Sequence, residues 1–477
     1  MISSDRMAAV DRNAAALGVP RKQLMESSGN AVARAVREVA APGDEVAVVA
    51  GRGNNGGDGF VAARFLSAFD VTVHLLGRRS AIATDIAREN WDALQEAELD
   101  CREVTDSRTL ALDGPDVIVD AMLGTGVTGA LRDPERTAAR EINDADAAVV
   151  AVDVPSGVDA DTGETHGVAV EADRVVTFHD RKPGLADREG VTVADIGIPD
   201  AAETFVGPGD LQGLARDPQS HKGDFGRVMV VGGGPYTGAP ALTATAALRA
   251  GADLVFVHAP ERVADTIQGY GPDVITAGYD GPVLTPAHVD GLLEAAADRD
   301  VAVLGPGLGD ADATREAVRE FLERYEGRAV VDADALGVVP EVETDATLVC
   351  TPHQGELAEM GGPRESDWRA RADAVESFAA ELGHTLLVKG AYDVVTDGET
   401  TRINRTGNPG MTVGGTGDVL AGVTSALLAV RDPVPAAAVA AYANGRAGDA
   451  VVEQRGHGLL ASDLTDALPD ALRDPAE

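Results

Sequence analysis

Apolar and polar residues alternate along the chain with a rhythm that predicts two α/β domains. Short apolar runs, most of them rich in valine, are separated by stretches with the spacing of amphipathic helices. In the first half these runs lie at residues 45–50, 71–76, 117–119, 147–152 and 174–178. In the second half they lie at residues 226–232, 253–258, 301–304, 329–332, 348–350, 386–389 and 394–396. Each half is therefore predicted to be a doubly wound, three-layer α/β domain, and the first half to have a parallel sheet.

The ends of the two series set the expected domain boundaries. Two helices should precede the first strand, because apolar residues have helical spacing over residues 3–39 and Pro20 restarts the pattern. The periodicity lapses around residues 207–218. We therefore place a first domain at residues 1–211 and a second at residues 212–477. A chain of 477 residues also exceeds what one hydrophobic core usually organises.

Charge and composition narrow the function classes. The formal net charge is -38, which disfavours nucleic acid as a partner. Acidic residues are spread over the whole chain, so we interpret them as a halophilic feature, a solvated surface suited to a salt-rich cytoplasm. The first residues lack the apolar core of a signal peptide and no uncharged apolar run is long enough to cross a membrane, so we expect a cytoplasmic protein. The two cysteines, Cys101 and Cys350, fit a reduced compartment.

Three loops of the first half carry candidate chemistry. The run at 45–50 is followed by the glycine-rich segment 51–59, whose asparagines and aspartate exceed what a plain turn needs. Asp120 and Asp153 follow two other strands of the series, each with a glycine-containing loop. Since parallel strands end at one edge of a sheet, all three loops should meet where α/β ligands bind. Capping of a helix or turn is the alternative reading for either aspartate.

These loops, together with the segment Lys182-Pro-Gly184, resemble the NAD(P)H-hydrate epimerase family over roughly residues 1–210. The resemblance implies a Rossmann-like fold and a hydrated dinucleotide held by two segments. Their residues are Asn54, Asn55, Gly56, Gly57 and Asp58, then Gly124, Thr125, Gly126, Val127, Thr128, Gly129 and Ala130. It also implies a potassium ion bound by oxygens of Asn55, Asp120 and Ser156. Asp153 would contact the ring and move the proton as hydroxide leaves and returns, with Lys182 stabilising charge. A surface lysine is the other reading of Lys182.

A second glycine-rich segment lies at residues 407–422 and leads into an apolar helix. The backbone N–H groups of Gly414 to Gly417 should point at an anion, reinforced by the helix dipole. Asp418 falls in the first turn of that helix, where it could be an ordinary N-terminal acid. A carboxylate beside a phosphate site is also well placed to deprotonate a hydroxyl, and we favour that catalytic interpretation.

This segment and four others, 221–223, 305–309, 351–356 and 389–391, resemble ribokinase-like NAD(P)H-hydrate dehydratases over roughly residues 215–470. The resemblance implies a ribokinase-like second domain that binds the hydrate and a nucleotide. The hydrate would contact Ala239, Gly307, His353 and Asp418, and the nucleotide Lys389, Gly390, Ala391, Tyr392, Asp393 and Gly417. Glu356 would orient Mg²⁺ through water. A core or capping role stays open for His353.

The two resemblances together imply one repair pathway. The first domain would interconvert the R and S hydrates of NADH and NADPH, and the second would dehydrate the S form with ADP, releasing AMP and phosphate. The partners would then be small molecules, without nucleic acid or membrane, and we also expect a homo-oligomer. Two alternatives stay open: a kinase for a vitamin-like alcohol with a ligand-binding front domain, and a front half that is a non-enzymatic binding module.

Overall fold

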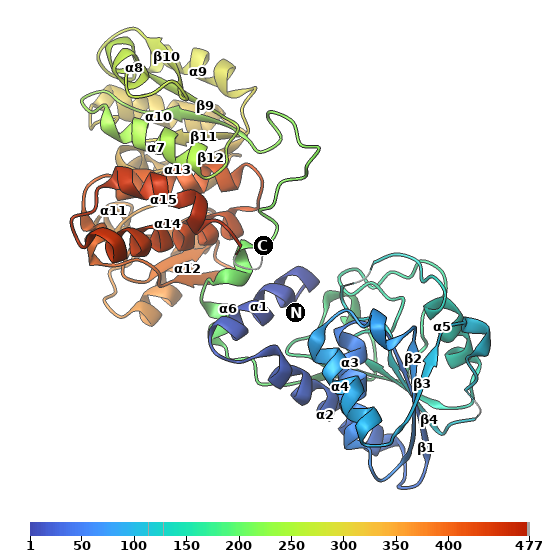
Figure 1. Cartoon of the computed structure of the whole chain (residues 1–477). Coiled ribbons are helices and arrows are strands. Elements are labelled where there is room, and N and C mark those ends of the chain that lie inside the picture. The colour runs from blue at the N-terminus through green and yellow to red at the C-terminus, as the bar shows by residue number, and fades with distance from the viewer. Residues whose placement is uncertain (113, 127, 475–477) are drawn as a thin grey trace. The chain divides into compact units, whose positions relative to one another are not determined.

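The computed structural model describes residues 1–112, 114–126 and 128–474, and its contacts divide the chain into two compact units. The first unit is Met1–Ala202 and the second is Glu203–Glu477. Each unit is a sheet with helices packed on both faces (Figure 1), which confirms the predicted fold class. Every helix among the described residues is too short or too polar to cross a lipid bilayer.

The first unit has a seven-stranded, fully parallel sheet with strand order β3-β2-β1-β4-β5-β6-β7. The strands are β1 (Glu45–Ala50), β2 (Asp70–Leu76), β3 (Asp100–Val104), β4 (Val117–Ala121), β5 (Ala148–Val152), β6 (Arg174–Phe178) and β7 (Val191–Ala194). The register aligns Ala50 with Leu75 on one side and Ala121 on the other. The carboxyl ends of these strands therefore lie side by side.

Alternation along the central strands divides the core of this unit into two layers. Val46 and Val48 point into one layer, while Ala47 and Val49 point into the other. The first layer holds helices α1 (Ser4–Ala16), α2 (Arg21–Val39), α3 (Asn54–Phe65) and α4 (Asp85–Glu96), and the second holds α5 (Glu135–Asp144). The two helices expected before the first strand are α1 and α2.

The second unit has a nine-stranded mixed sheet with order β10-β9-β8-β11-β12-β13-β14-β15-β16. The strands are β8 (Arg227–Val231), β9 (Leu254–Pro260), β10 (Ile275–Tyr279), β11 (Val301–Leu304), β12 (Arg328–Val331), β13 (Thr347–Cys350), β14 (Thr385–Val388), β15 (Asp393–Thr396) and β16 (Thr401–Asn404). Neighbours from β10 to β14 are parallel, and β15 is antiparallel to both β14 and β16. A parallel core with an antiparallel edge is a common form of a doubly wound sheet.

Helices cover both faces of the second sheet as well. Val228 and Val230 of β8 face one core layer, and Met229 and Val231 face the other. The first layer holds α7 (Gly238–Arg249), α8 (Glu261–Gln268), α13 (Thr416–Leu428), α14 (Pro433–Arg455) and α15 (Ala461–Ala471). The second holds α9 (Val289–Ala296), α10 (Asp312–Arg324), α11 (Gln354–Glu359) and α12 (Trp368–Leu382).

The division between the units falls at Ala202, within the short helix α6 (Ala201–Thr204) and before the boundary expected at residue 211. Val206 and Leu211 are buried in the core of the second unit. The guanidinium of Arg402 on β16 donates to both carboxylate oxygens of Asp210, at 2.9 and 3.0 Å. Segment 203–211 therefore packs with the second sheet, although it lacks a strand-like apolar pattern.

Candidate active sites

A cavity of about 430 Å³ lies among the loops at the carboxyl edge of the first sheet. Helix α3 begins at Asn54, just after β1, and its first turn faces the loops that follow β4 and β5. The cavity wall includes the following predicted residues: Asn54, Asn55, Asp58, Gly124, Thr125, Gly126 and Asp153. The structure thus brings the three loops to one site.

Asp153 lines this cavity and forms an ion pair with Lys182, which is not among the lining residues. Asp153 follows β5 with a left-handed backbone (φ 65°), a conformation that non-glycine residues seldom adopt. Lys182 is fully buried, and its Nζ lies 3.1 Å from Asp153 Oδ1. The same ammonium donates to the Thr177 hydroxyl and the Phe178 carbonyl, at 3.1 and 2.9 Å. The surface-lysine reading of Lys182 is therefore wrong.

Asp120 and Ser156 form a buried pair beside this cavity. Asp120 is fully buried, and its Oδ1 accepts a 2.7 Å hydrogen bond from the Ser156 hydroxyl, while its Oδ2 accepts from the Ser156 amide at 2.8 Å. Burial raises the pKa of Asp120 to about 6, and these hydrogen bonds act against that rise. Asn55 Nδ2 is buried without a hydrogen-bond partner among the described residues. That orphaned amide indicates that the site is built to contact a ligand.

Three other glycines allow close packing around the start of α3, and two of them, Gly29 and Gly57, bring helices α2 and α3 together. A Cβ on Gly57 would lie 2.8 Å from the sulfur of Met25, and one on Gly29 would lie 2.7 Å from the carbonyl oxygen of Asp58. A Cβ on Gly56 would overlap the carbonyl oxygen of Gly51. Close packing therefore requires glycine at positions 29, 56 and 57, and Gly56 and Gly57 are absent from the cavity wall described above.

The remaining residues predicted to bind the dinucleotide lie farther along the loop after β4. Thr128, Gly129 and Ala130 are exposed and are not among the residues that line the large cavity. Val127 lies outside the described residues.

Helices α1 and α2 supply part of the cavity wall that sequence reasoning missed. Asp11, Arg12 and Arg21 line it from these helices. Burial raises the pKa of Asp11 to about 6, although Arg21 opposes the rise. Burial also raises the pKa of Asp58 well above its usual range, and Asp153 and Asp11 add to that effect. The sequence signal for Asp11 was an acidic residue one helical turn after the apolar residue Met7.

In the second unit, helix α13 begins directly after Gly415, whose left-handed backbone (φ +99°) favours glycine. Asp418 lies in its first turn, and the Thr243 hydroxyl of α7 donates to the Asp418 carbonyl at 3.1 Å. Burial raises the pKa of the Asp418 carboxyl to about 7, with Asp332 adding to the rise and Lys389 opposing it. An acid that titrates near neutrality is suited to general base catalysis.

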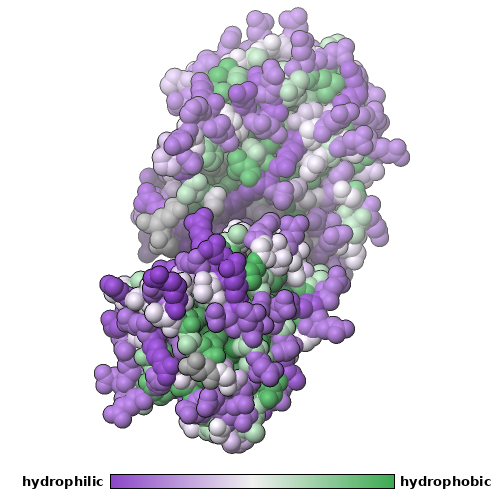
Figure 2. Space-filling view, turned by 90° about the vertical axis from the view of Figure 1, so that its right-hand side faces the viewer, coloured by the Kyte–Doolittle hydropathy of each residue, from purple (hydrophilic) through white to green (hydrophobic). Residues whose placement is uncertain are grey.

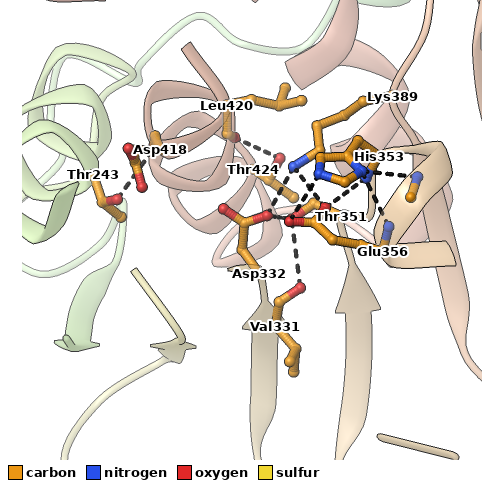
Figure 3. A network of polar contacts seen from close by, with 11 residues as sticks. Thr243, Val331, Asp332, Thr351, His353, Glu356, Lys389, Asp418, Leu420 and Thr424 are labelled. Atoms are coloured by element: carbon orange, nitrogen blue, oxygen red, sulfur yellow. Dashed lines mark hydrogen bonds and ion pairs between the residues drawn. The ribbon is translucent and has the colours of Figure 1, made fainter. Parts of the chain in front are cut away.

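Lys389 lies at the centre of the polar network shown in Figure 3. Its Nζ donates to Asp332 Oδ1 at 3.0 Å and lies 3.6 Å from Glu356 Oε2. Thr351 donates to the same Asp332 oxygen at 2.8 Å. Burial lowers the pKa of Lys389, but the two carboxylates outweigh it and raise the pKa. A Cβ on Gly417 would lie 3.4 Å from Nζ, so the cation borders the backbone at the start of α13.

His353 caps helix α11, the reading that the sequence had left open. Its Nδ1 accepts from the amides of Gly355 and Glu356, at 2.9 and 3.1 Å. Glu356 Oε2 in turn accepts from the His353 amide at 2.7 Å, which completes a capping box. Because Nδ1 is the acceptor, the ring proton belongs on Nε2, which lies 3.6 Å from Glu356 Oε1.

The other residues expected to bind nucleotide or hydrate lie between β14 and the first residue of β15, in the loop after β11 and in helix α7. Asp393 accepts from the Gly390 amide at 2.8 Å, and burial raises its pKa to about 6. Tyr392 stacks on Trp368 with ring centroids 5.1 Å apart. Ala391, which precedes Tyr392 in the sequence, is exposed. A Cβ on Gly307 would lie 3.4 Å from that of Ala239.

Asp332 is the group in this network that sequence reasoning did not single out. It follows β12 and is 2% exposed. The rule that selected Asp120 and Asp153, an aspartate directly after a parallel strand, would have found it. No cluster of three His, Cys, Asp or Glu side chains within the described parts of the chain could hold a metal ion.

Comparisons with known proteins cover both units. Residues 21–184 match the family model of the YjeF-related protein N-terminus, and residues 228–470 match that of NAD(P)H-hydrate dehydratase. The bifunctional NAD(P)H-hydrate repair enzyme Nnr of Pyrobaculum aerophilum is 45% identical, over 99% of this chain and 98% of the relative. The enzyme of the same name from Methanothermobacter thermautotrophicus is 43% identical, over 98% and 94%. The crystal structure of a ribokinase-like superfamily protein from Enterococcus faecalis, 25% identical, has a TM-score of 0.51 and covers 57% of this chain and 97% of its own.

Proposed function

This chain belongs to the family of bifunctional NAD(P)H-hydrate repair enzymes, and on that premise we propose which residues carry each activity. The chain is an epimerase and dehydratase that repairs hydrated NAD(P)H. We assign the epimerase to the unit Met1–Ala202 and the dehydratase to the unit Glu203–Glu477, because the two family matches lie within them. The observation that carries the assignment of roles is the pair of acids, Asp153 in the first site and Asp418 in the second.

In the epimerase site, Asp153 takes part in the proton transfers that accompany loss and return of the hydroxyl. The lone pair of the ring nitrogen expels the hydroxyl from the neighbouring carbon, and the proton that makes it water comes from a carboxyl of the site. Water then adds to the planar cation on the other face and gives its proton back. The Lys182 ammonium, 3.1 Å from Asp153, offsets the negative charge that the carboxylate carries in this cycle. Arg12 and Arg21 supply positive charge for the phosphates of the dinucleotide.

We assign a potassium site to the oxygens of Asn55, Asp120 and Ser156. Oδ1 of the buried Asp120 lies 2.7 Å from the Ser156 hydroxyl oxygen, and Asn55, which lines the cavity, carries a side-chain amide oxygen that can serve as a ligand. A single carboxylate with neutral oxygens suits a hard monovalent cation rather than zinc or iron. When bound, the ion supplies positive charge beside the phosphates. Epimer exchange measured in KCl against tetramethylammonium chloride tests this assignment.

In the dehydratase site, Asp418 is the general base. It removes the proton of the hydroxyl of the S hydrate, and that oxygen attacks the terminal phosphoryl group of ADP while AMP departs. The backbone amides around Gly417 and the neighbouring Lys389 ammonium hold the phosphoryl oxygens. Loss of phosphate, driven by the ring nitrogen, and then of a ring proton restores the reduced coenzyme.

We propose that a magnesium ion binds with the nucleotide and that Glu356 orients this ion through a water molecule. Glu356 Oε2 is engaged by the His353 amide and Lys389, whereas Oε1 lies 3.6 Å from His353 Nε2, beyond hydrogen-bond distance. One carboxylate oxygen is thus left for a hydrated cation, which fits the preference of Mg²⁺ for keeping its waters. When bound, the ion neutralises phosphate charge.

Recovery of NADH from an equal mixture of R and S hydrates tests both roles in one assay. Supplied with ADP and Mg²⁺, the wild-type chain should restore nearly all of the NADH absorbance. Asp153→Asn should restore the S half rapidly and the R half slowly, and Asp418→Asn should restore neither. The same assay with ATP in place of ADP shows which of the two nucleotides the enzyme uses. A stable phosphorylated product without NADH, or full recovery by both variants, would contradict the proposal.

We also propose that the acidic surface adapts the protein to a salt-rich cytoplasm. The formal net charge is -38, and Figure 2 shows hydrophilic residues over most of the face in view. Screening by salt weakens the self-repulsion of such a surface. A homo-oligomer stays a prediction, which light scattering can check.

A further inference from the structure

Asp11 is an acidic side chain in the epimerase cavity to which no role has yet been given. It lies on α1, before residue 21, where the match to the family model begins. It lines the cavity together with Asp58 and Asp153. No hydrogen-bond donor among the described residues engages its carboxyl group, unlike the carboxylate of Asp153, which is held by Lys182.

Charged groups from several elements face Asp11. Arg21 of α2, Lys182 and His179 lower its pKa, whereas burial and Asp153 raise it, and the balance lies at about 6. The negative charge of Asp11 also helps to raise the pKa of Asp58 of α3, after the larger effect of burial. The two carboxyl groups differ in environment, since Asp153 is ion-paired with Lys182, whereas at Asp11 desolvation outweighs the attraction of Arg21. Two carboxyl groups in unlike environments are what an acid–base pair requires.

We propose that Asp11 is the second proton-transfer group of the epimerase, the acid in the step in which Asp153 is the base. The inference rests on the epimerase function proposed above. Asp11 gives its proton to the departing hydroxyl, the C–O bond breaks, and water leaves. A water on the other face forms the new C–O bond and gives its proton to Asp153. One turnover leaves Asp11 ionised and Asp153 protonated, and either a turnover in the reverse direction or proton exchange with solvent water restores the starting state, so no other reactant is needed.

Two carboxyl groups explain why the cavity wall continues onto α1. A single proton-transfer group would have to serve both faces of the ring, whereas Asp11 and Asp153 come from different elements, an N-terminal helix and the end of β5. Each can then serve one face while the ring stays bound.

The variant Asp11→Asn in the full chain tests the proposal. We expect epimer exchange, followed by NMR in the absence of nucleotide, to fall by about 100-fold. Dehydration of the purified S hydrate by the second unit should not change, which gives each preparation an internal measure of enzyme concentration. Asp5→Asn, an exposed position on the same helix, should leave both activities intact.

The pH profile separates catalysis from a structural role. Exchange by the wild-type chain should decline above about pH 6, as Asp11 loses its proton, and Asp11→Asn should lack this decline. Unchanged exchange in Asp11→Asn, or a lower rate with the same profile, would overturn the inference. If the wild-type chain and Asp153→Asn exchanged epimers at the same rate, the epimerase assignment itself would fail, so the two failures are distinguishable.

Discussion

The ammonium of Lys389 lies 3.0 Å from the carboxylate of Asp332, which is almost completely buried and also accepts from Thr351. Asp332 thereby fixes the lysine beside the start of α13. We expect Asp332→Asn to lower kcat/KM for dehydration by about 10- to 100-fold, because a neutral amide holds the cation less firmly. Epimer exchange in the same preparation should be unchanged. Equal dehydration by variant and wild type would refute a positioning role.

The second prediction concerns the pH dependence of dehydration. Burial raises the pKa of Asp418 to about 7, and the base must be ionised to accept a proton. Activity on the S hydrate should therefore increase as the pH rises from 5.5 to 8, with a midpoint near neutrality. Single-turnover rates measured over this range will check the prediction. A profile that is flat across neutrality would show that another group limits the reaction.

The same carboxyl should reduce stability at high pH. Its folded pKa lies above the ordinary value of 3.8, so the unfolded chain releases the proton first, and the cost of ionising Asp418 in the fold grows between about pH 4 and 7. Asp418→Asn removes that cost, and we expect the second unit to gain about 1–2 kcal/mol at pH 8 and little at pH 4. Urea unfolding at both pH values measures the difference. A gain of equal size at pH 4 would point to a cause other than ionisation.

The fourth prediction concerns Gly305, which has a φ of +124°. A Cβ at this position would overlap the carbonyl oxygen of Asp332. We expect Gly305→Ala to destabilise the second unit by about 3 kcal/mol and to impair dehydration, because Asp332 is displaced. Gly291→Ala in α9 is the matched control, since a Cβ there meets no atom within 4 Å and a helix prefers alanine. Similar melting temperatures for both variants would contradict the steric argument.

The fifth prediction concerns the dependence of the melting temperature on salt concentration. With a formal net charge of -38, the folded chain should gain melting temperature steadily as KCl rises from 0.1 to 2 M. Sucrose, which is excluded from protein surfaces but does not screen charge, separates screening from general stabilisation. A melting temperature that responds to sucrose but not to KCl would rule out charge repulsion as a significant term.

The strands absent from the sequence-based expectation are those at the edges of the sheets. They are β3 and β7 in the first sheet and β10 and β16 in the second. Central strands are covered on both faces and therefore read as apolar runs, whereas β3 contains the exposed residues Asp100, Arg102 and Glu103. Apolar patterning consequently predicted the interiors of both sheets but could not reveal their edges.

The sites divide in a similar way. Loops that follow strands could be predicted, because glycine and aspartate at a strand end are local signals. Asp11 and Arg21 could not, since they reach the cavity from helices that are distant in sequence from the loops. The role of Lys182 lay between these cases: its motif was visible, but its complete burial depends on how β5 and β6 pack.

The close contact between α2 and α3 limits how the first site can open. Because Gly29 and Gly57 carry no side chain, the side chains of Val61 and Met25 on the facing helix pack directly against them, and neither helix can shift without creating a clash or a void. The wall that they form is consequently rigid. Asn54, Asn55 and Asp58, which line the cavity from the start of α3, are therefore held in place before the dinucleotide arrives, so binding requires little rearrangement of this helix.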